Sequence, residues 1–223
     1  MPKALVLLSG GLDSTVTLAL ALEHDDVVKC VHFAYGQTHM NEVMHALRVA
    51  EHYKVPMQTV PVLYSHIKPT NETGALLDNE LDQNLAATTS KDKIGEQVSA
   101  TFVPGRNIVF LALAGGICDS EHIDHIYIGV NSVDYSGYPD CRPHFINAMH
   151  NALNEGLRRK ITIFAPLIHK TKGQIIEAGI KLNAPLHLTW SCYAGQERPC
   201  GICPSCKVRA NGFAEAGIPD PAL

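Results

Sequence analysis

The chain has 223 residues, 46% of them apolar, and its 18 basic and 22 acidic side chains give a formal net charge of −4. This length suits one large domain, or one domain with a small appendage, and the composition excludes disordered, collagen-like and coiled-coil proteins. The acidic balance argues against a protein that coats DNA, since such proteins carry a basic surplus. No apolar run reaches the ~18 residues of a membrane helix, and the start lacks the features of a signal peptide, so we expect a cytoplasmic protein.

The first third of the sequence alternates between short apolar runs and helical patterns. Residues 4–8 (ALVLL) are wholly apolar, which is typical of a strand buried on both faces of a parallel sheet. In residues 41–54, Val43, Leu47 and Ala50 follow helical spacing and predict one buried face. The β-α-β-α-β order predicts a parallel sheet with right-handed crossovers. The expected strands are 4–8, 27–33 and 57–63, and the expected helices are 15–23 and 41–54.

Residues 64–100 interrupt this alternation with a long polar stretch, which is typical of a lid or a mobile loop. The alternation then resumes. Asp140 is a candidate N-cap for the helix that has Pro143 in its first turn, and Thr171 with Gln174 matches a capping box. The expected helices are 108–118, 145–157 and 172–182, and the expected strands are 126–130 and 161–167.

From Trp190 onward the composition shifts to Cys, Gly and Pro, and Pro204 is expected to open a last helix. We therefore predict two parts. Residues 1–189 form a doubly wound α/β domain, a Rossmann-like fold with a parallel sheet of about five strands. Residues 190–223 form a small C-terminal metal-binding segment.

A glycine-rich turn, Ser9-Gly10-Gly11-Leu12-Asp13-Ser14, joins the first strand to the first helix. Adjacent glycines allow positive φ, so that successive N–H groups point into one concavity, and the helix adds its positive N-terminal end. The Ser9 and Ser14 hydroxyls can donate to phosphate oxygens, while Asp13 suggests a bridging Mg²⁺ or a capping role. The turn has neither the ending of a Walker A loop nor the third glycine of a dinucleotide motif. An ordinary strand-to-helix turn is the alternative.

Two middle segments carry side chains that suit a nucleotide or a purine-like ring. Arg106 follows a Pro-Gly turn at a helix start and could place its guanidinium on a phosphate. The loop after the fourth strand is where α/β proteins bind ligands. There, Asp134 or Asp140 could accept from ring N–H groups, with Tyr135 or Tyr138 against the ring face. A surface turn and a turn-rich loop with packed tyrosines are the plainer interpretations.

Four of the seven cysteines lie close together near the C-terminus, at Cys192, Cys200, Cys203 and Cys206. In a reducing compartment, a metal site explains such a cluster better than disulfides do. Four sulfurs suit tetrahedral Zn²⁺, but the Cys-x2-Cys-x2-Cys spacing also occurs around iron–sulfur clusters. A redox Cys-x-x-Cys pair is a third interpretation.

The glycine-rich turn resembles the pyrophosphate loop of the PP-loop ATP pyrophosphatases. This resemblance implies that the chain binds ATP with Mg²⁺, cleaves it between the α and β phosphates, and adenylates its substrate. It makes Asp13, Ser14 and Arg106 the candidate catalytic residues. It also implies that the nucleotide-binding segment comprises Leu8, Ser9, Gly10, Gly11, Leu12, Asp13, Ser14, Thr15, Val16, Thr17 and Leu18, with the pyrophosphate held by Ser9, Gly10, Gly11, Asp13 and Ser14.

Further motifs resemble the 7-cyano-7-deazaguanine synthases of queuosine biosynthesis. The resemblance implies that ATP and ammonia convert 7-carboxy-7-deazaguanine into the nitrile through an adenylated acid and an adenylated amide. It also implies a structural Zn²⁺ on the four clustered cysteines and a homodimer. Free ammonia is the expected donor, because the length leaves no room for a glutaminase domain. The motifs are FVPGRN (102–107), GYPDCR (137–142), Ala34-Tyr35-Gly36-Gln37 and Arg209-Ala210-Asn211-Gly212.

Two other functions remain open on the sequence alone. A PP-loop tRNA thiolase needs a persulfide or an iron–sulfur centre and usually an RNA-binding module, and the net charge of −4 counts against it. A non-catalytic zinc-ribbon binding module would explain the four cysteines but not the phosphate loop. We expect neither a nucleic-acid partner nor a membrane partner. Adenylation does not need Cys141 as a nucleophile, and we expect His32 to be hydrogen-bonded or solvated.

Overall fold

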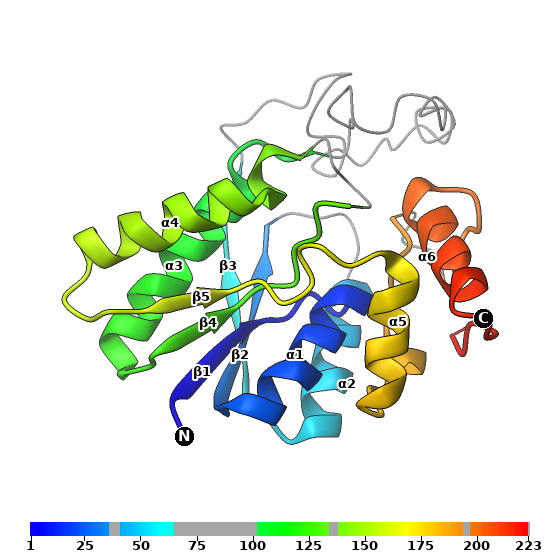
Figure 1. Cartoon of the computed structure of the whole chain (residues 1–223), viewed down its shortest axis with the longest axis horizontal. Coiled ribbons are helices and arrows are strands. Elements are labelled where there is room, and N and C mark those ends of the chain that lie inside the picture. Colours follow the sequence, from blue (N-terminus) through cyan, green and yellow to red (C-terminus); the bar gives the residue numbers. More distant parts are fainter. Residues whose placement is uncertain (36–40, 65–101, 134–137, 194–196, 223) are drawn as a thin grey trace.

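The computed structural model describes residues 1–35, 41–64, 102–133, 138–193 and 197–222 (Figure 1). Five strands form one parallel sheet in the order β3-β2-β1-β4-β5, which confirms the predicted doubly wound α/β fold. The strands are β1 (Lys3–Leu7), β2 (Asp26–Ala34), β3 (Met57–Pro61), β4 (His125–Tyr127) and β5 (Thr162–Phe164).

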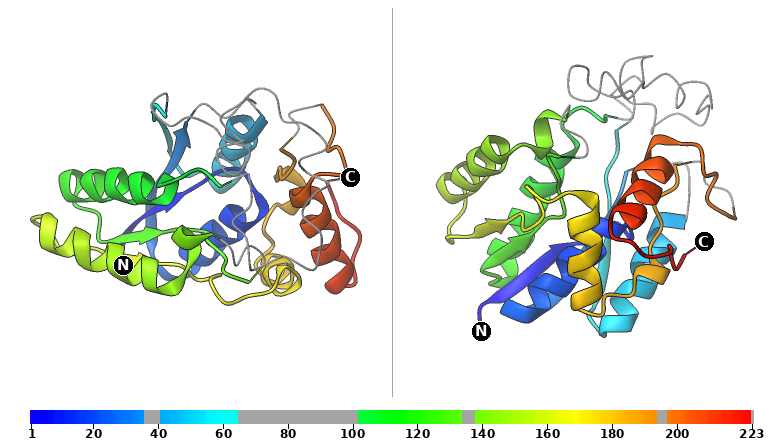
Figure 2. Two further views of the ribbon diagram at one scale, coloured as in Figure 1. Left: turned by 90° about the horizontal axis from the view of Figure 1, so that it is seen from above. Right: turned by 45° about the vertical axis from the view of Figure 1, so that its right-hand side comes forward.

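Helices cover both faces of this sheet (Figures 1 and 2). On one face lie α3 (Arg106–Glu121) and α4 (Pro143–Gly156). On the other face lie α1 (Leu12–His24) and α2 (Asn41–Tyr53). Next to α1 the chain adds α5 (Lys172–Lys181), and α6 (Pro204–Glu215) packs against α5. Two short 3-10 helices, Pro139–Cys141 and Leu186–Leu188, complete the regular elements of the described residues.

The central strand β1 shows why the apolar run at the start of the chain is needed. Ala4, Val6 and Leu8 pack with α1 and α2, whereas Leu5 and Leu7 pack with α3 and α4. All five side chains are buried. Because both faces of the strand are covered, no position in this run can face water, and the predicted two-sided burial is confirmed.

The order of the strands reverses at β1, which lies between β2 and β4. In doubly wound sheets such a reversal leaves a crevice at the carboxyl ends of the strands, where ligands bind. The loop after β1 and the chain after β4 come close together there. A Cβ atom on Gly129 would lie 3.0 Å from the Cα and N atoms of Ser14, so this approach requires glycine.

The buried face of α2 differs from the prediction. Val43 is only half-buried and Leu47 is 38% exposed, so these two side chains do not form the core face. The helix backbone instead runs close to the glycine-rich loop, where a Cβ atom on Gly10 would lie 2.6 Å from the backbone nitrogen of Ala46. This close approach turns the small side chains of α2 inward: the buried residues are Ala46, Val49 and Ala50.

Asp140 does not cap α4, contrary to the prediction. Arg142 occupies the N-cap position of that helix, without a side-chain hydrogen bond, and Pro143 begins the helix. Asp140 lies one step earlier, in the 3-10 helix, and its carboxylate instead accepts from the backbone N–H of Asn107 in the first turn of α3. Elsewhere the end signals are confirmed: Thr171 and Gln174 form the predicted capping box, and α6 begins at Pro204.

Strands β4 and β5 have three residues each, fewer than the predicted 126–130 and 161–167. After β4 the chain leaves the sheet, and Ile128, Gly129, Val130 and Asn131 line the crevice instead. The predicted lid or mobile loop, 64–100, lies outside the described residues apart from Tyr64. No helix in the described part of the chain is both long enough and apolar enough to cross a membrane.

Candidate functional site

A cavity of about 270 Å³ opens at the crevice beside β1. Its walls include the loop after β1, the end of β2, the first turns of α3, the chain after β4, the 3-10 helix before α4, the start of α5, and the C-terminal segment. One end is polar and lies on the glycine-rich loop. The other end is aromatic and lies between β2 and α3.

The glycine-rich loop forms the polar end. Gly10 has φ of +85°, and the next residue, Gly11, is the N-cap of α1. The Ser9 and Ser14 hydroxyls are 3.0 Å apart, and Ser14 Oγ also accepts from the backbone N–H of Ser9. Gly11 has no capping side chain, so the start of α1 keeps donors and positive potential for an anion. The geometry therefore matches the anion-binding turn that the sequence predicts.

Asp13 makes an ion pair that the sequence analysis did not foresee. Lys172 Nζ lies 2.6 and 2.8 Å from the two carboxylate oxygens of Asp13. Both side chains are largely buried, at 11% and 24% exposure, and both residues line the cavity. Lys172 is also the first residue of α5, where a cation opposes the helix dipole. That unfavourable position was the available signal for a functional lysine. The pair is neutral overall, and it places an ammonium and a carboxylate together at the same end as the loop.

The C-terminal segment closes the polar end from the opposite side. The backbone N–H of Trp190 donates to the carbonyl of Gly10 at 2.9 Å, and the indole stacks on His45 of α2 at 5.2 Å between centroids. Trp190 and Ser191 both line the cavity. The loop after β1 and the C-terminal segment therefore line one site together.

Arg209 anchors this second wall. It is 7% exposed and makes a bidentate ion pair with Asp220, at 2.5 and 2.8 Å. Its Nη1 also donates to Thr189 Oγ1 at 2.7 Å, and its guanidinium lies over the ring of Phe213. Arg209 stands in a motif that the sequence analysis used only for the resemblance. The structure places it on the cavity wall.

Aromatic side chains form the other end of the cavity. Phe33 of β2 and Phe110 of α3 stack with their centroids 4.4 Å apart, and the ring of Tyr35 lies 5.5 Å from that of Phe110. Arg106 holds its guanidinium 5.7 Å above the Tyr35 ring. Burial alone would lower the pKa of Arg106, but Tyr35, Tyr138 and Asp140 around it raise that pKa, so it stays charged. A flat ring with an acidic group would match this end.

The predicted ring-binding residues fall into three groups. Asp134 and Tyr135 lie outside the described residues. Tyr138 lines the cavity and packs against Phe102. Asp140 is 4% exposed and is not on the cavity wall, because its carboxylate is held 3.2 Å from the backbone nitrogen of Asn107.

Cys141, the next residue, does line the cavity. Burial, reinforced by the neighbouring Asp140 carboxylate, raises the pKa of the Cys141 thiol to about 12. A protonated thiol is a poor nucleophile. His32 also reaches the cavity wall, and it is hydrogen-bonded as expected, with Nδ1 3.0 Å from the carbonyl of Leu8.

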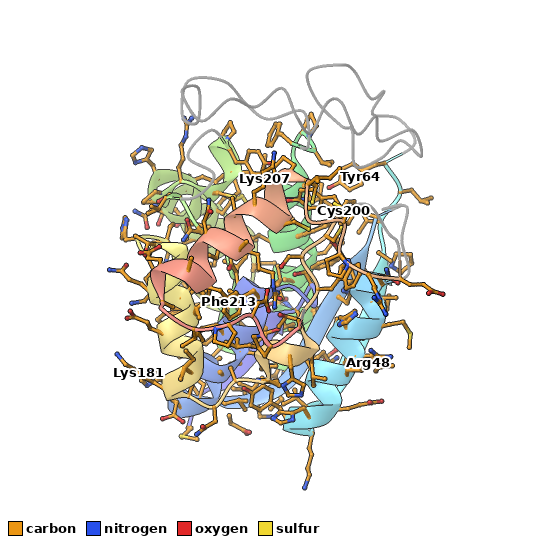
Figure 3. All side chains as sticks on the ribbon, turned by 90° about the vertical axis from the view of Figure 1, so that its right-hand side faces the viewer. Arg48, Tyr64, Lys181, Cys200, Lys207 and Phe213 are labelled. Carbon is orange, nitrogen blue, oxygen red and sulfur yellow. The ribbon has the colours of Figure 1, made fainter. Side chains whose placement is uncertain are left out.

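The four clustered cysteines converge at the start of α6 (Figure 3 labels Cys200). Their Sγ atoms all lie within 4.8 Å of one another, and all four are free thiols. Tetrahedral zinc with Zn–S of about 2.3 Å would separate its sulfurs by ~3.8 Å, so the set has the size of a metal site. Backbone N–H groups point at three of the sulfurs, at 3.3 to 3.4 Å. Hydrogen bonds from the thiols of Cys192 and Cys206 lower the pKa of Cys203.

The parallel sheet, the glycine-rich loop at its switch point and the cysteine cluster define an α/β protein of the PP-loop ATPase class. A solved structure described as a 4-thiouridine synthetase–RNA complex with bound ATP shares this fold, with a TM-score of 0.50 and 16% identity over 97% of this chain and 50% of that one. Residues 3–217 match the family described as queuosine biosynthesis protein QueC, and the chain belongs to this family.

Full-length relatives agree with this membership. The chain is 44% identical to a 7-cyano-7-deazaguanine synthase of Thermoplasma volcanium, over 99% of this chain and 90% of the relative. It is 42% identical to a 7-cyano-7-deazaguanine synthase of Oceanobacillus iheyensis, over 98% and 96%. The resemblance that the motifs indicated is confirmed, and neither the tRNA thiolase nor the zinc-ribbon module is favoured.

Proposed function

We propose that this chain uses ATP to convert 7-carboxy-7-deazaguanine and ammonia into 7-cyano-7-deazaguanine, a step of queuosine biosynthesis. The observation that carries the proposal is a single cavity that joins a phosphate-binding loop to an aromatic end with a charged arginine. Two substrates can therefore meet in it, a nucleotide by its phosphates and a flat acid by its ring. The names of the relatives over nearly the whole chain support the same reaction.

At the polar end we propose that the loop holds the β- and γ-phosphates of ATP. Backbone N–H groups after Gly10 and the hydroxyls of Ser9 and Ser14 would donate to phosphate oxygens. The ammonium of Lys172 adds positive charge at the same end, next to Asp13. We propose that Asp13 would help to hold a Mg²⁺ that accompanies ATP; when bound, this ion would supply positive charge to balance the pyrophosphate.

Adenylation supplies the leaving group that a free carboxylate lacks. A carboxylate oxygen attacks the α-phosphorus of ATP, the bond from this phosphorus to the bridging oxygen breaks, and pyrophosphate leaves. Ammonia then attacks the acyl carbon, AMP leaves, and loss of a proton gives the amide. The amide oxygen attacks the α-phosphorus of a second ATP and a second pyrophosphate leaves, and loss of AMP and two protons then gives the nitrile. We propose that Arg106 pairs with the phosphate that becomes joined to the acid.

The C-terminal segment, 190–223, is proposed to bind one Zn²⁺ through Cys192, Cys200, Cys203 and Cys206. A metal with four thiolate ligands has no open position, so its role would be structural. Zinc would leave the protein colourless, whereas an iron–sulfur cluster would colour it brown. Free thiolates persist in a reducing compartment, which supports a cytoplasmic location. We also propose a homodimer, as the family resemblance implies.

The decisive experiment supplies the purified protein with ATP, ammonium and 7-carboxy-7-deazaguanine, and follows pyrophosphate release together with product masses. We expect the amide and then the nitrile, with two AMP formed for each nitrile. The control substrate is 7-deazaguanine, which has no carboxylate to adenylate. A tRNA substrate serves as the second control. Pyrophosphate released with tRNA but not with the acid would overturn the proposal.

A further inference from the structure

The aromatic end of the cavity contains one polar atom without an assigned role, the side-chain oxygen of Asn107. This residue lies in the first turn of α3, is 6% exposed, and lines the cavity. Its amide is oriented by its neighbours, because Nδ2 donates to the backbone carbonyl of Asp140 at 3.0 Å. A carbonyl can only accept, so the nitrogen must face it and the oxygen must point elsewhere.

One further contact involves this side chain, and two more hold the residues around it. Nδ2 also lies 3.6 Å from Cys141 Sγ, and the backbone N–H of Asn107 donates to the Asp140 carboxylate. The Cys141 thiol in turn points at Asp140, with 3.8 Å from Sγ to Oδ1. Among the described residues, no donor reaches Asn107 Oδ1. This oxygen is also not sealed off from solvent, since it is not among the fully buried side-chain atoms without a hydrogen bond in the described part of the chain. Since Asn107 lines the cavity, the oxygen is available there.

We propose that Asn107 determines substrate specificity, its Oδ1 accepting a hydrogen bond from an N–H group of the deazaguanine ring, with Asp140 and Cys141 as positioning residues. This inference rests on the proposed function. A buried, pre-oriented acceptor selects strongly for a donor, because a ring without one leaves the oxygen unpaired. The Phe33–Phe110 stack provides an apolar surface for the ring. The hydrogen bond to Asn107 fixes the orientation of the ring on that surface.

Arg106, the residue before Asn107, indicates which ring occupies the aromatic end: the adenine of ATP or the deazaguanine ring of the acid. Arg106, one residue earlier, holds a charged guanidinium at the same end of the cavity. Adenine carries no anionic group of its own, whereas the deazaguanine substrate carries a carboxylate on its ring. Arg106 pairs with the phosphate that becomes joined to this carboxylate, and Asn107 accepts from a ring N–H of the same substrate. The aromatic end therefore suits the acid better than it suits adenine.

The test combines one variant with three substrate analogues. Each analogue of 7-carboxy-7-deazaguanine lacks one donor: the N1–H, the 2-amino group or the N9–H. In the wild-type protein, kcat/KM should fall about 10- to 100-fold for at least one analogue. In Asn107→Ala the same analogue and the natural acid should differ less than about 3-fold. In the matched variant Ile108→Ala, which changes the next, exposed residue of α3 outside the cavity and keeps Oδ1, the wild-type discrimination should persist.

Several outcomes would overturn the inference. One is that each analogue lowers kcat/KM, relative to the natural acid, by the same factor in the wild type and in Asn107→Ala. Another is a change in Asn107→Ala confined to KM for ATP or to KM for ammonium. If Asn107→Ala does not fold, a crystal structure of the wild type with the acid decides, because it must place a ring nitrogen 2.7–3.2 Å from Oδ1. A wild-type protein that does not convert the acid at all would instead refute the proposed function.

Discussion

The two walls of the polar end hold their shape in different ways. The N-terminal wall, residues 9–15, depends on backbone geometry: a positive φ at Gly10, hydroxyl bonds within the loop, and close approach to α2. The C-terminal wall, residues 189–220, depends on side chains: four thiols, a stacked tryptophan, and the buried pair of Arg209 and Asp220.

The difference teaches where each wall is vulnerable. A loop shaped by glycine fails when a Cβ atom is added, whereas a wall held together by side chains fails when those side chains are removed. The walls meet in the hydrogen bond from Trp190 to Gly10 and on the ring of His45. A substitution in either wall should therefore weaken nucleotide binding. Only a substitution in the C-terminal wall should also release the metal.

The largest effect is expected when the C-terminal wall loses a metal ligand. In Cys203→Ser we expect the bound metal to be lost and the free energy of unfolding to fall by more than about 3 kcal/mol, since structural zinc contributes on the order of 10 kcal/mol in small domains. Elemental analysis and thermal unfolding measure the two quantities. Cys30→Ser is the matched control, a buried cysteine in β2 outside the cluster, and it should keep the metal. Unchanged metal content in Cys203→Ser would exclude the four-thiolate site.

The next largest effect is expected in the N-terminal wall. Gly10→Ala combines an unfavourable φ of +85° with a Cβ atom 2.5 Å from the Glu42 carbonyl oxygen. We expect urea unfolding to show a loss of about 3 kcal/mol, with the metal retained. Gly105→Ala separates the two causes, because Gly105 has a φ of +72° but open space around it, and it should lose only about 1 kcal/mol. Equal losses in the two variants would mean that contact with α2 is unimportant.

The sequence predicts these two walls because their signals are local. The glycines of the loop and the spacing from Cys200 to Cys206 lie within short stretches, and the apolar run of β1 predicts a strand covered on both faces. Contacts between distant elements are different. Nothing near Asp13 indicates that its partner is Lys172, because that pairing depends on how α5 packs against α1.

The errors at the buried face of α2 and at the N-cap of α4 have the same origin. The sequence spacing on α2 suggested a face with Leu47, but the packing of the loop against the helix selected the alanines instead. Asp140 has the chemistry of a ring acceptor and of an N-cap for α4, yet the 3-10 helix directs its carboxylate to α3. The sequence indicates what a side chain can do, and the fold decides which neighbour it meets.

A smaller effect is expected when the link between Asp13 and Lys172 is broken. Asp13→Asn leaves a mostly buried ammonium without its carboxylate, and we expect a loss of about 2 kcal/mol in stability and about 100-fold in pyrophosphate release. The double variant with Lys172→Gln should be more stable than the sum of the two single losses. Unfolding experiments on all four proteins give the coupling energy. Strict additivity would show that the pair contributes nothing.

The smallest effect concerns the histidine beneath the loop. Burial lowers the pKa of His32 below its usual 6.5, although the carbonyl of Leu8 opposes this shift. Below about pH 6.5, His32 therefore binds a proton more readily in the unfolded chain than in the folded chain. The free energy of unfolding falls as the pH decreases.

We expect the wild type to lose stability between pH 6.5 and 5.5 through His32, by at most about 1 kcal/mol. In His32→Asn this part of the loss should disappear, because an amide can still donate to the Leu8 carbonyl but does not titrate. The control His24→Asn, in the exposed last turn of α1, should keep the wild-type pH dependence. Urea unfolding across this pH range measures the difference. An unchanged slope in His32→Asn would mean that the folded protein accepts the proton, and that the N-terminal wall tolerates a charge directly beneath its phosphate loop.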